Sequence, residues 1–378
     1  MTAIVLTGAS VLDPDTGSTE RADVLLRDGR IAAVGSGIDG DERVACGGGV
    51  LVPGLIDCHV HVAFPRPEPL PRSARILEAV PVLQRLLSHG ITTVRDAWGA
   101  DAGFTHALRQ QWITGPDLLI SLRQLSPTGG LGDAWEPDTG ATDRLGDPAL
   151  PDPVFDSPDA ARAAVRRMVR AGVDWIKIGA GGALRSVREG REICATDEEL
   201  RAVVDEAGRC DRDVLAHAHS PLAAITASRA GVRSIEHGVF LNEDAVAAMK
   251  EHGCWYVPTL APIAGLGDES AIAAHHRSLA LAIDAGIPVA AGSDLAVRPH
   301  VDLLSEIRLL ATAGLGDAGA WKAATSEAAR LLRLDHDRGR IEPGLRADLA
   351  LLDGPGLSVE DLPSRIRAVW HDGRQVRG

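Results

Sequence analysis

Two histidines, His59 and His61, are separated by a single residue at the end of an apolar run that begins at Val50. Alternate residues of a strand point to the same side, so both imidazoles can bind one metal ion. Four further side chains that could bind a metal or act as a nucleophile each close an apolar run of their own, namely Lys177, His217, His237 and Asp294. Together, these six side chains predict a hydrolytic centre with two metal ions.

Lys177 stands out because this chain uses lysine very sparingly. Lysine and arginine together number 39, and only Lys177, Lys250 and Lys322 are lysine. A lysine can lose its proton and become a nucleophilic amine, whereas an arginine cannot. The residues beside Lys177 are apolar, and a buried unpaired charge is costly. We therefore interpret Lys177 as a functional residue, with a chance lysine that pairs with an acid as the alternative.

The composition is that of a folded enzyme. The chain has 378 residues, of which 45% are hydrophobic and 24% are charged, and its net charge is −13. That length accommodates a large barrel and a small accessory domain, and the charge argues against nucleic acids and anionic membranes as partners. No signal peptide, membrane span or CxxC pair is evident. We expect a cytoplasmic protein with free thiols and a small-molecule substrate, and a homo-oligomer is compatible with the sequence.

The two ends of the chain are both rich in strand patterns. Residues 22–34 and 367–376 read as hairpins with Asp-Gly turns, and residues 347–352 read as a strand. These segments predict one small β-sandwich domain formed by both termini, from residues 1–53 and 341–378.

The middle of the chain, residues 54–340, alternates apolar strands with helices that begin at capping residues and end at glycines. About eight such units predict a TIM (β/α)8 barrel within an α/β fold, with the active site at the C-terminal ends of the strands. A doubly wound sheet is the alternative, but it explains neither the number of units nor the spread of ligands over several strands.

The six side chains divide into two sets of metal ligands. One ion would be held by His59, His61 and Asp294, and the other by His217 and His237. A bridging anion is needed between the ions, yet Lys177 stands where an acidic residue is expected. Its ammonium would repel both cations, whereas a carbamate formed with carbon dioxide would supply two oxygens. Zinc is the first expectation, and manganese, cobalt and iron use such ligands as well.

These motifs resemble those of the metal-dependent amidohydrolase superfamily, in its binuclear carboxylated-lysine subtype. The segments that carry the resemblance are residues 53–61, 90–96, 234–238, 291–294 and 341–349. The resemblance extends over essentially the whole chain and is strongest to the imidazolonepropionase-like and Xaa-Pro dipeptidase-like branch. True imidazolonepropionases lack the bridging lysine, so Lys177 favours the dipeptidase-like side.

The resemblance implies hydrolysis of a C–N bond by a metal-bridging hydroxide, in a peptide-like, N-acyl or cyclic amide. Asp294 would accept the proton of the hydroxide and later deliver one to the leaving nitrogen. His219 would share the direction of His217 if the strand continues. Related enzymes often place a tyrosine or histidine there to hydrogen-bond the substrate carbonyl.

Leu131 departs from the pattern of the family. It lies in the segment 122–156, a long loop rich in proline, glycine and aspartate that is expected to form a lid or a wall of the pocket. Relatives usually carry a histidine at this position, and leucine can neither donate a hydrogen bond nor carry a charge. Leu131 therefore favours a neutral or more apolar substrate over a dipeptide with a free carboxylate.

Other candidate substrate contacts are less specific. Tyr256 either lines the pocket or packs as a core aromatic. Arg298 either binds a substrate carboxylate or makes a surface ion pair, and His300 lies close to it in the sequence. His275 and His276 are expected on the surface of a helix.

Three other functions remain open at this point. One is a mononuclear enzyme, such as a deaminase or an imidazolone-type hydrolase, in which Lys177 is only structural. A second is a lactonase, since the same hydroxide attacks esters. The third is a non-catalytic relative, against which the presence of all six ligands counts.

Overall fold

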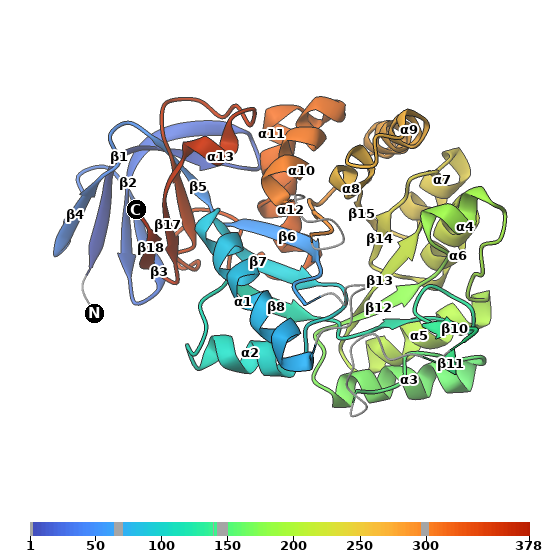
Figure 1. Ribbon diagram of the computed structural model, residues 1–378. Coiled ribbons are helices and arrows are strands. Elements are labelled where there is room, and N and C mark those ends of the chain that lie inside the picture. Colours follow the sequence, from blue (N-terminus) through green and yellow to red (C-terminus); the bar gives the residue numbers. More distant parts are fainter. Residues whose placement is uncertain (1–2, 64–70, 139, 142–149, 296–301) are drawn as a thin grey trace.

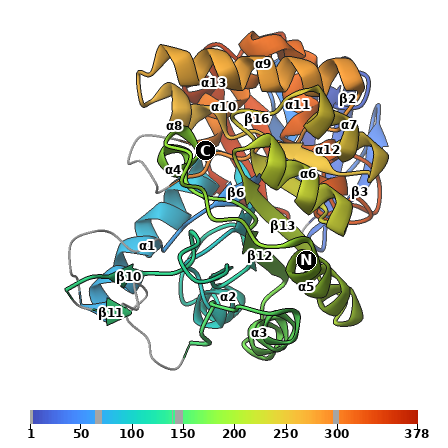
Figure 2. The same cartoon turned by 90° about the vertical axis from the view of Figure 1, so that its right-hand side faces the viewer.

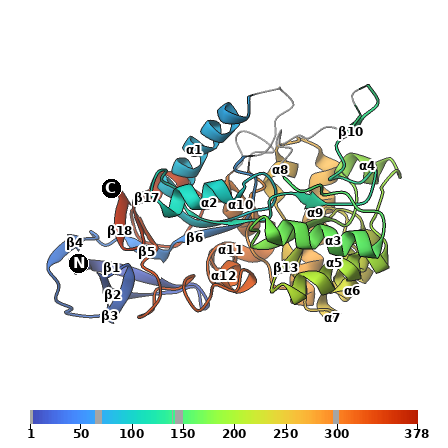
Figure 3. The ribbon, with the colours of Figure 1, turned by 90° about the horizontal axis from the view of Figure 1, so that it is seen from below.

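The computed structural model describes residues 3–63, 71–138, 140–141, 150–295 and 302–378. It shows an α/β fold in which a sheet built from both ends of the chain lies beside a larger region of parallel strands and helices (Figure 1). Seen from below, the terminal sheet occupies one end of the molecule, and strand β10 (Trp135–Glu136), which pairs with β11 (Gly140–Ala141), lies toward the other end (Figure 3). Within the described ranges, no helix is long and apolar enough to cross a bilayer.

The terminal sheet has eight strands in the order β18-β17-β16-β5-β1-β2-β3, with β4 paired to β1. These strands are β1 (Ile4–Asp13), β2 (Ser18–Arg27), β3 (Arg30–Gly35), β4 (Glu42–Ala45), β5 (Val50–Pro53), β16 (Leu349–Leu352), β17 (Ile366–His371) and β18 (Arg374–Arg377). Both hairpins predicted from Asp-Gly pairs are confirmed. They turn at Asp28-Gly29 and Asp372-Gly373, where all four residues have the positive φ that such turns require.

Gly54 joins the two parts of the molecule. Its amide donates to the carbonyl of Asp348, 2.7 Å away, so the chain leaves the terminal sheet and enters β6 without a loop. A Cβ at this position would overlap the side chain of Thr92. Only glycine therefore allows the passage that delivers His59 and His61 to the end of β6.

Apart from the short antiparallel pair β10–β11, the described strands of the α/β region are parallel to their neighbours. One group runs β6-β7-β8 and the other β15-β14-β13-β12-β9. Their bounds are β6 (Leu55–Val60), β7 (Ile91–Asp96), β8 (Asp117–Ile120), β9 (Gln124–Leu125), β12 (Trp175–Gly179), β13 (Asp213–Ala218), β14 (Ser234–His237) and β15 (Trp255–Val257). The third strand, predicted at residues 118–121, corresponds to β8, and Leu122, with a positive φ of 64°, separates it from β9. The amide of Asp174, just before β12, donates to the carbonyl of Ile120 and links the two groups on that side.

The eighth strand, predicted at residues 287–294, is not a regular strand in the structure. Its backbone nevertheless forms hydrogen bonds with strands on both sides. The amide of Tyr256 donates to Pro288, and the amide of Cys58 donates to Ala291. The amide of Asp294 donates to the carbonyl of His59 at 2.7 Å. The segment therefore links β15 to β6 and brings Asp294 beside the two histidines.

Helices surround the parallel strands (Figure 2). Their bounds are α1 (Arg72–Ser88), α2 (Ala102–Arg109), α3 (Pro158–Arg170), α4 (Leu184–Arg188), α5 (Asp197–Arg209), α6 (Pro221–Ala230), α7 (Glu243–Glu251), α8 (Leu260–Ala264), α9 (Glu269–Ala285), α10 (Leu303–Leu310), the π-helical turn Ala311–Leu315, α11 (Gly316–Ala323), α12 (Ser326–Leu331) and α13 (Leu362–Arg365). The predicted capping box is confirmed, since Thr196 and Glu199 bond reciprocally at the start of α5. Predicted stops at Gly231 and Gly286 adopt the left-handed conformation.

A small apolar cluster fills the space between the strands. It joins Ile56, Trp175, Leu215 and Val257 from four strands with Leu331 of α12. The larger core lies between the strands and the surrounding helices. Both clusters hold the strands rigidly, so the side chains at the strand ends have fixed positions.

Candidate metal centre

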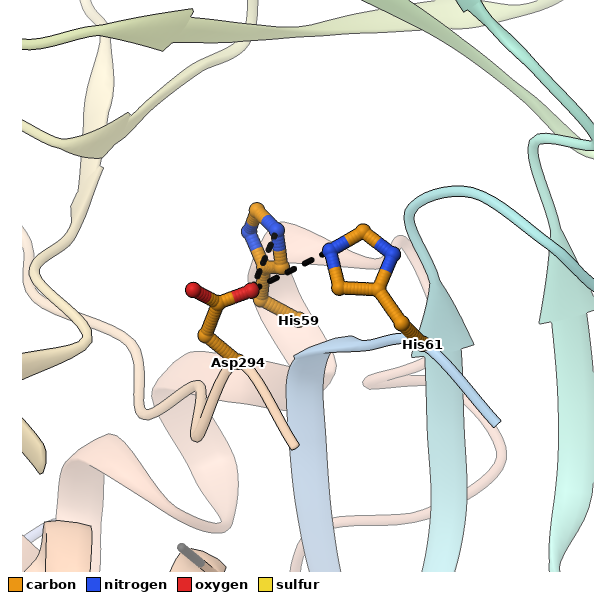
Figure 4. A group of neighbouring side chains, drawn as sticks. All are labelled: His59, His61 and Asp294. Carbon is orange, nitrogen blue, oxygen red and sulfur yellow. Dashed lines mark ion pairs between the residues drawn. The ribbon is translucent and has the colours of Figure 1, made fainter. Parts of the chain in front are cut away.

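Three of the predicted ligands meet where β6 ends. Oδ1 of Asp294 lies 3.1 Å from Nε2 of His61 and 3.6 Å from Nε2 of His59. Figure 4 shows that one carboxylate oxygen of Asp294 faces both imidazoles while the other points away from them. The ligand atoms of the three buried residues lie within 4.8 Å of one another, which is a suitable spacing for one metal ion.

The other three predicted side chains lie beside this group. His217 and His237 come from the neighbouring strands β13 and β14, and their ring centroids are 4.6 Å apart. The ring of His237 is also 4.8 Å from that of His59. Lys177, on β12, is 1% exposed and lines the same cavity. The structure thus brings together all six side chains that the sequence predicted as ligands.

Backbone carbonyls determine which nitrogen of two imidazoles carries the proton. Nδ1 of His61 lies 2.8 Å from the carbonyl oxygen of Trp98, and Nε2 of His217 lies 3.2 Å from that of Gly182. A carbonyl only accepts hydrogen bonds, so these two nitrogens are the protonated ones. When such a ring is neutral, its other nitrogen keeps the lone pair that a metal ion requires.

Glu236, which the sequence analysis did not single out, orients His59. Its Oε2 lies 2.5 Å from Nδ1 of His59, and Arg95 donates to both of its oxygens at 2.9 and 3.1 Å. Glu236 and Arg95 are fully buried, and the guanidinium stacks on Trp175 at 4.6 Å. A carboxylate behind a histidine fixes the ring and raises its basicity toward a metal. The position of Glu236 next to His237 in the sequence is the signal that could have revealed it.

We expect Glu236→Gln to lower metal affinity by about 10-fold to 100-fold. Glutamine keeps the shape of the side chain but loses the charge that Arg95 and His59 both contact. A titration with a competing chelator measures the change. Glu199→Gln is a matched control, because Glu199 is also buried but serves the capping box of α5. An unchanged affinity in Glu236→Gln would show that the carboxylate does not support the ligand.

His237 adopts a strained backbone conformation, with φ of 70°. Its carbonyl oxygen accepts hydrogen bonds from the hydroxyl of Tyr256 at 2.9 Å and from Nε2 of His275 at 2.7 Å. Its own Nδ1 lies 2.7 Å from Oγ1 of Thr259. Three buried side chains thus hold the backbone and the ring of this predicted ligand.

These contacts correct two predictions. Tyr256 is fully buried and is not among the residues that line the cavity, because its hydroxyl is directed to the backbone behind His237. His275 is 1% exposed rather than on the surface, because it lies on the face of α9 that packs against the β14 end. Arg298 and His300 lie outside the described residues.

Asp57 fixes the backbone beside Asp294. Its carboxylate accepts hydrogen bonds from the amide of Ser293 at 2.9 Å and from the hydroxyl of Ser293 at 2.6 Å. Asp294 itself has φ of 53°, in the left-handed region that aspartate and asparagine tolerate better than most residues. Asp57 thus helps to aim the carboxylate of Asp294 at the histidines.

The residues present fit a divalent cation. Nε2 of His59, Oδ1 of Asp294 and Nζ of Lys177 are buried without any hydrogen-bond partner, and such orphaned polar atoms are costly in a folded protein. Nε2 of His61 faces Oδ1 of Asp294 at 3.1 Å. Both atoms are therefore placed to bind the same cation.

The ionisation states agree with this interpretation. Burial and the neighbouring positive charges hold the pKa of His59, His217 and His237 well below the ordinary value, so these rings are neutral. Burial lowers the pKa of Lys177 to about 8, against the pull of Glu236 and Asp294. Neutral imidazoles are the form that binds metal ions.

A cavity of about 280 Å³ opens onto these six side chains. His219 and Leu131 line it, as predicted, and so does Gln124, which the sequence analysis missed. Nδ1 of His219 and the amide nitrogen of Gln124 are buried without a hydrogen-bond partner. Both nitrogens therefore lack a partner within the described part of the protein. Burial lowers the pKa of His219 to about 3, so this ring is neutral.

Comparisons with known proteins identify the family. A model of the amidohydrolase family matches residues 50–377, and the chain belongs to that family. The ochratoxinase of Aspergillus niger is 29% identical in an alignment 423 residues long, gaps included. This alignment covers 98% of this chain and 86% of the fungal protein. The imidazolonepropionase of Paracoccus denitrificans is 28% identical in an alignment 381 residues long, gaps included, which covers 89% of each chain.

The similarity extends to solved structures. A prolidase crystallised in complex with N-methylphosphonate-L-proline is 32% identical, with a TM-score of 0.89 over 100% of both chains. The predicted resemblance to the imidazolonepropionase-like and Xaa-Pro dipeptidase-like branch is thereby confirmed. The protein is an enzyme of the amidohydrolase family.

Proposed function

We propose that this protein is a binuclear metal-dependent amidohydrolase that cleaves an amide, N-acyl or cyclic amide bond in a small molecule. The observation that carries the proposal is the meeting of six side chains in one cavity, three of them with buried and unpartnered ligand atoms. The six come from β6 and the residue after it, β12, β13, β14 and the irregular segment 287–295. The relatives named above support hydrolysis of a C–N bond.

The fold that we propose for this function is a (β/α)8 barrel, residues 54–340, with a β-sandwich domain from residues 1–53 and 341–378. The hydrogen bonds that link β15, the segment 287–295 and β6 support closure of the barrel. All six ligands would then lie at the C-terminal ends of its strands, where barrel enzymes place their active sites. The acidic charge of −13 supports a small-molecule substrate over nucleic acid, and we leave a homo-oligomer open.

His59, His61 and Asp294 would hold one divalent ion, zinc being the first expectation, and His217 and His237 the second. When bound, the two ions would supply water that ionises near neutral pH and would polarise a carbonyl group. Lys177 would join the two sets as a carbamate. Its neutral amine would form a bond to the carbon of carbon dioxide and release one proton, and the carbamate would supply two oxygens as ligands. The burial of Nζ without an acidic partner supports this role.

The remaining residues bind substrate and move protons. Asp294 would accept a proton from water on the oxygen that faces away from the histidines and deliver it to the leaving nitrogen. The unpartnered nitrogens of His219 and Gln124 would donate to the substrate carbonyl and hold it toward the ligands. The substrate is thus positioned between these donors and Asp294.

Two measurements on one preparation test the proposal. Elemental analysis of the purified protein is expected to find about two divalent ions per chain, and a hydrolysis screen over N-acyl amino acids, dipeptides, lactams and lactones is expected to find amide hydrolysis. One ion per chain with deamination would favour the mononuclear alternative in which Lys177 is structural. Activity on lactones alone would favour a lactonase.

Leu131→His is expected to raise kcat/KM for dipeptides with a free carboxylate by about 10-fold. Leu131 lines the cavity, and a histidine there would supply a hydrogen bond to a charged group, worth roughly 1.5–3 kcal/mol. Steady-state kinetics on one dipeptide and on its C-terminal amide measure the effect. Leu222→His is the control, since Leu222 is 63% exposed on α6. An unchanged kcat/KM in Leu131→His would show that this loop does not determine recognition of the substrate carboxylate.

A further inference from the structure

The cavity has two chemically different kinds of lining. The metal-binding side chains, His219, Gln124 and Thr259 supply its polar atoms. The other residues that line it are Trp98 and an apolar wall, which we define as Leu131, Ala183, Leu184, Pro262, Ile263 and Leu266. A volume of about 280 Å³ is at the lower end of small-molecule sites. The wall therefore covers a large share of any ligand that reaches the ligand atoms.

Three segments build the apolar wall. Leu184 begins α4, just after β12, while Ile263 lies in α8, just after β15. These two side chains belong to one small hydrophobic cluster with Val239, separate from the main core. Leu266, which follows α8, is 41% exposed although it lines the cavity. An apolar ligand would cover this leucine and gain from the contact.

Charged groups are absent from this wall. Among the described residues that line the cavity, the only lysine is Lys177 and there is no arginine. The arginines of α4 are already paired, Arg185 with Glu189 at 2.9 Å and Arg188 with Asp268 at 2.5 Å. No described residue of the wall would offer a carboxylate a cation in exchange for its water, and such a loss is unfavourable.

We propose that the substrates of this site carry a bulky, uncharged apolar group, aromatic or branched, that packs against the apolar wall while the amide faces the ligand side chains. This inference rests on the proposed function and specifies its substrate class. An aromatic ring buries a large area on such a surface, so we expect the ring to contribute about 100-fold to affinity. A free carboxylate is expected to contribute nothing.

Binding of three phosphonates to the metal-loaded protein tests the proposal without relying on turnover. Benzylphosphonate carries an aromatic ring, methylphosphonate lacks it, and phosphonoacetate replaces it by a carboxylate. Isothermal titration calorimetry is expected to find benzylphosphonate about 100-fold tighter than methylphosphonate, and phosphonoacetate no tighter than methylphosphonate. Equal affinities for the first two, or tightest binding of phosphonoacetate, would overturn the proposal.

Truncation of the wall provides a second readout. Leu266→Ala removes a side chain that is 41% exposed, so folding should not suffer. It is expected to weaken benzylphosphonate by about 10-fold and to leave methylphosphonate unchanged. Leu222→Ala, at a leucine that is 63% exposed on α6, is expected to change neither. Equal weakening of both phosphonates by Leu266→Ala would contradict a selective apolar contact.

Metal analysis of the same sample separates the two levels of inference. A protein that cannot be loaded with divalent ions contradicts the proposed function. A protein that is loaded, and binds the three phosphonates equally, contradicts only the role of the apolar wall.

Discussion

Replacing Lys177 by alanine is expected to remove most of the bound metal and to lower kcat/KM by at least about 1000-fold. Nζ of Lys177 has no hydrogen-bond partner in the structure, so the substitution breaks no polar contact of the protein itself. What is lost is the pair of carbamate oxygens proposed to lie between the two sets of histidines. Elemental analysis and hydrolysis kinetics on the same sample measure both effects.

Three comparisons show whether the carbamate is responsible. Lys177→Arg keeps the positive charge but cannot form a carbamate, so it is expected to be as inactive as Lys177→Ala. Acetate added to Lys177→Ala is expected to restore part of the activity, because it supplies two oxygens to the vacated space. Lys322→Ala changes an exposed lysine that pairs with Glu327 at 3.1 Å, and should retain metal and activity. Normal metal content and rate in Lys177→Arg would refute the carbamate.

The sequence predicted which six side chains meet in the cavity, because a site built at strand ends leaves a local signature. A histidine or lysine that closes an apolar run is already assigned to the end of a buried strand, and parallel strands place their ends together. His59 and His61 add the alternation that directs both rings to one side. The chemistry of the ligands and their positions along the chain are therefore both readable without a structure.

The side chains that support the proposed ligands could not be predicted from the sequence, because they come from distant segments of the chain. Glu236 lies 177 residues from His59, and Arg95 lies 141 residues from Glu236. Periodicity shows which strand a residue belongs to and which way it points, but not which side chain faces it from another strand. A buried acid next to a ligand was the only local indication.

His275 shows a signal that was present and misread. The buried residues of α9 recur every three or four positions, at Ala271, Ala274, His275, Ser278, Leu279 and Ala282. His275 therefore lies on the apolar stripe of this helix rather than on its outer face. Two adjacent polar residues, His275 and His276, suggested an exposed position on the helix. The helical period instead puts His275 on the buried face.

Two left-handed residues stand where regular strand pairing stops. Leu122, with φ of 64°, lies between β8 and β9, and Asp294, with φ of 53°, lies at the end of the irregular segment 287–294. Sequence reasoning assumed ordinary backbone for a leucine and an aspartate in apolar surroundings. The positive φ turns the carboxylate of Asp294 out of the strand direction and toward His59 and His61, so the irregularity serves the site.

Asp294→Asn is expected to lower kcat by about 100-fold to 10,000-fold while much of the metal remains. Asparagine keeps the size of the side chain and an oxygen that can bind a cation, and it tolerates the φ of 53° at this position. Its amide cannot accept the proton that the carboxylate would take from water. The effect should therefore fall on kcat and leave KM within a few fold, which steady-state kinetics and elemental analysis together resolve.

A matched change elsewhere separates proton transfer from general damage. Asp174→Asn makes the same change from carboxylate to amide at a half-buried residue. The carboxylate of Asp174 accepts a hydrogen bond from the amide of Ile120 and lies outside the cavity. This substitution is expected to affect stability more than kcat. Near-normal turnover in Asp294→Asn would remove Asp294 as the proton carrier. Loss of all metal from this variant would show instead that the carboxylate acts chiefly as a ligand, because the proton-transfer role predicts inactivity in a protein that still holds its ions.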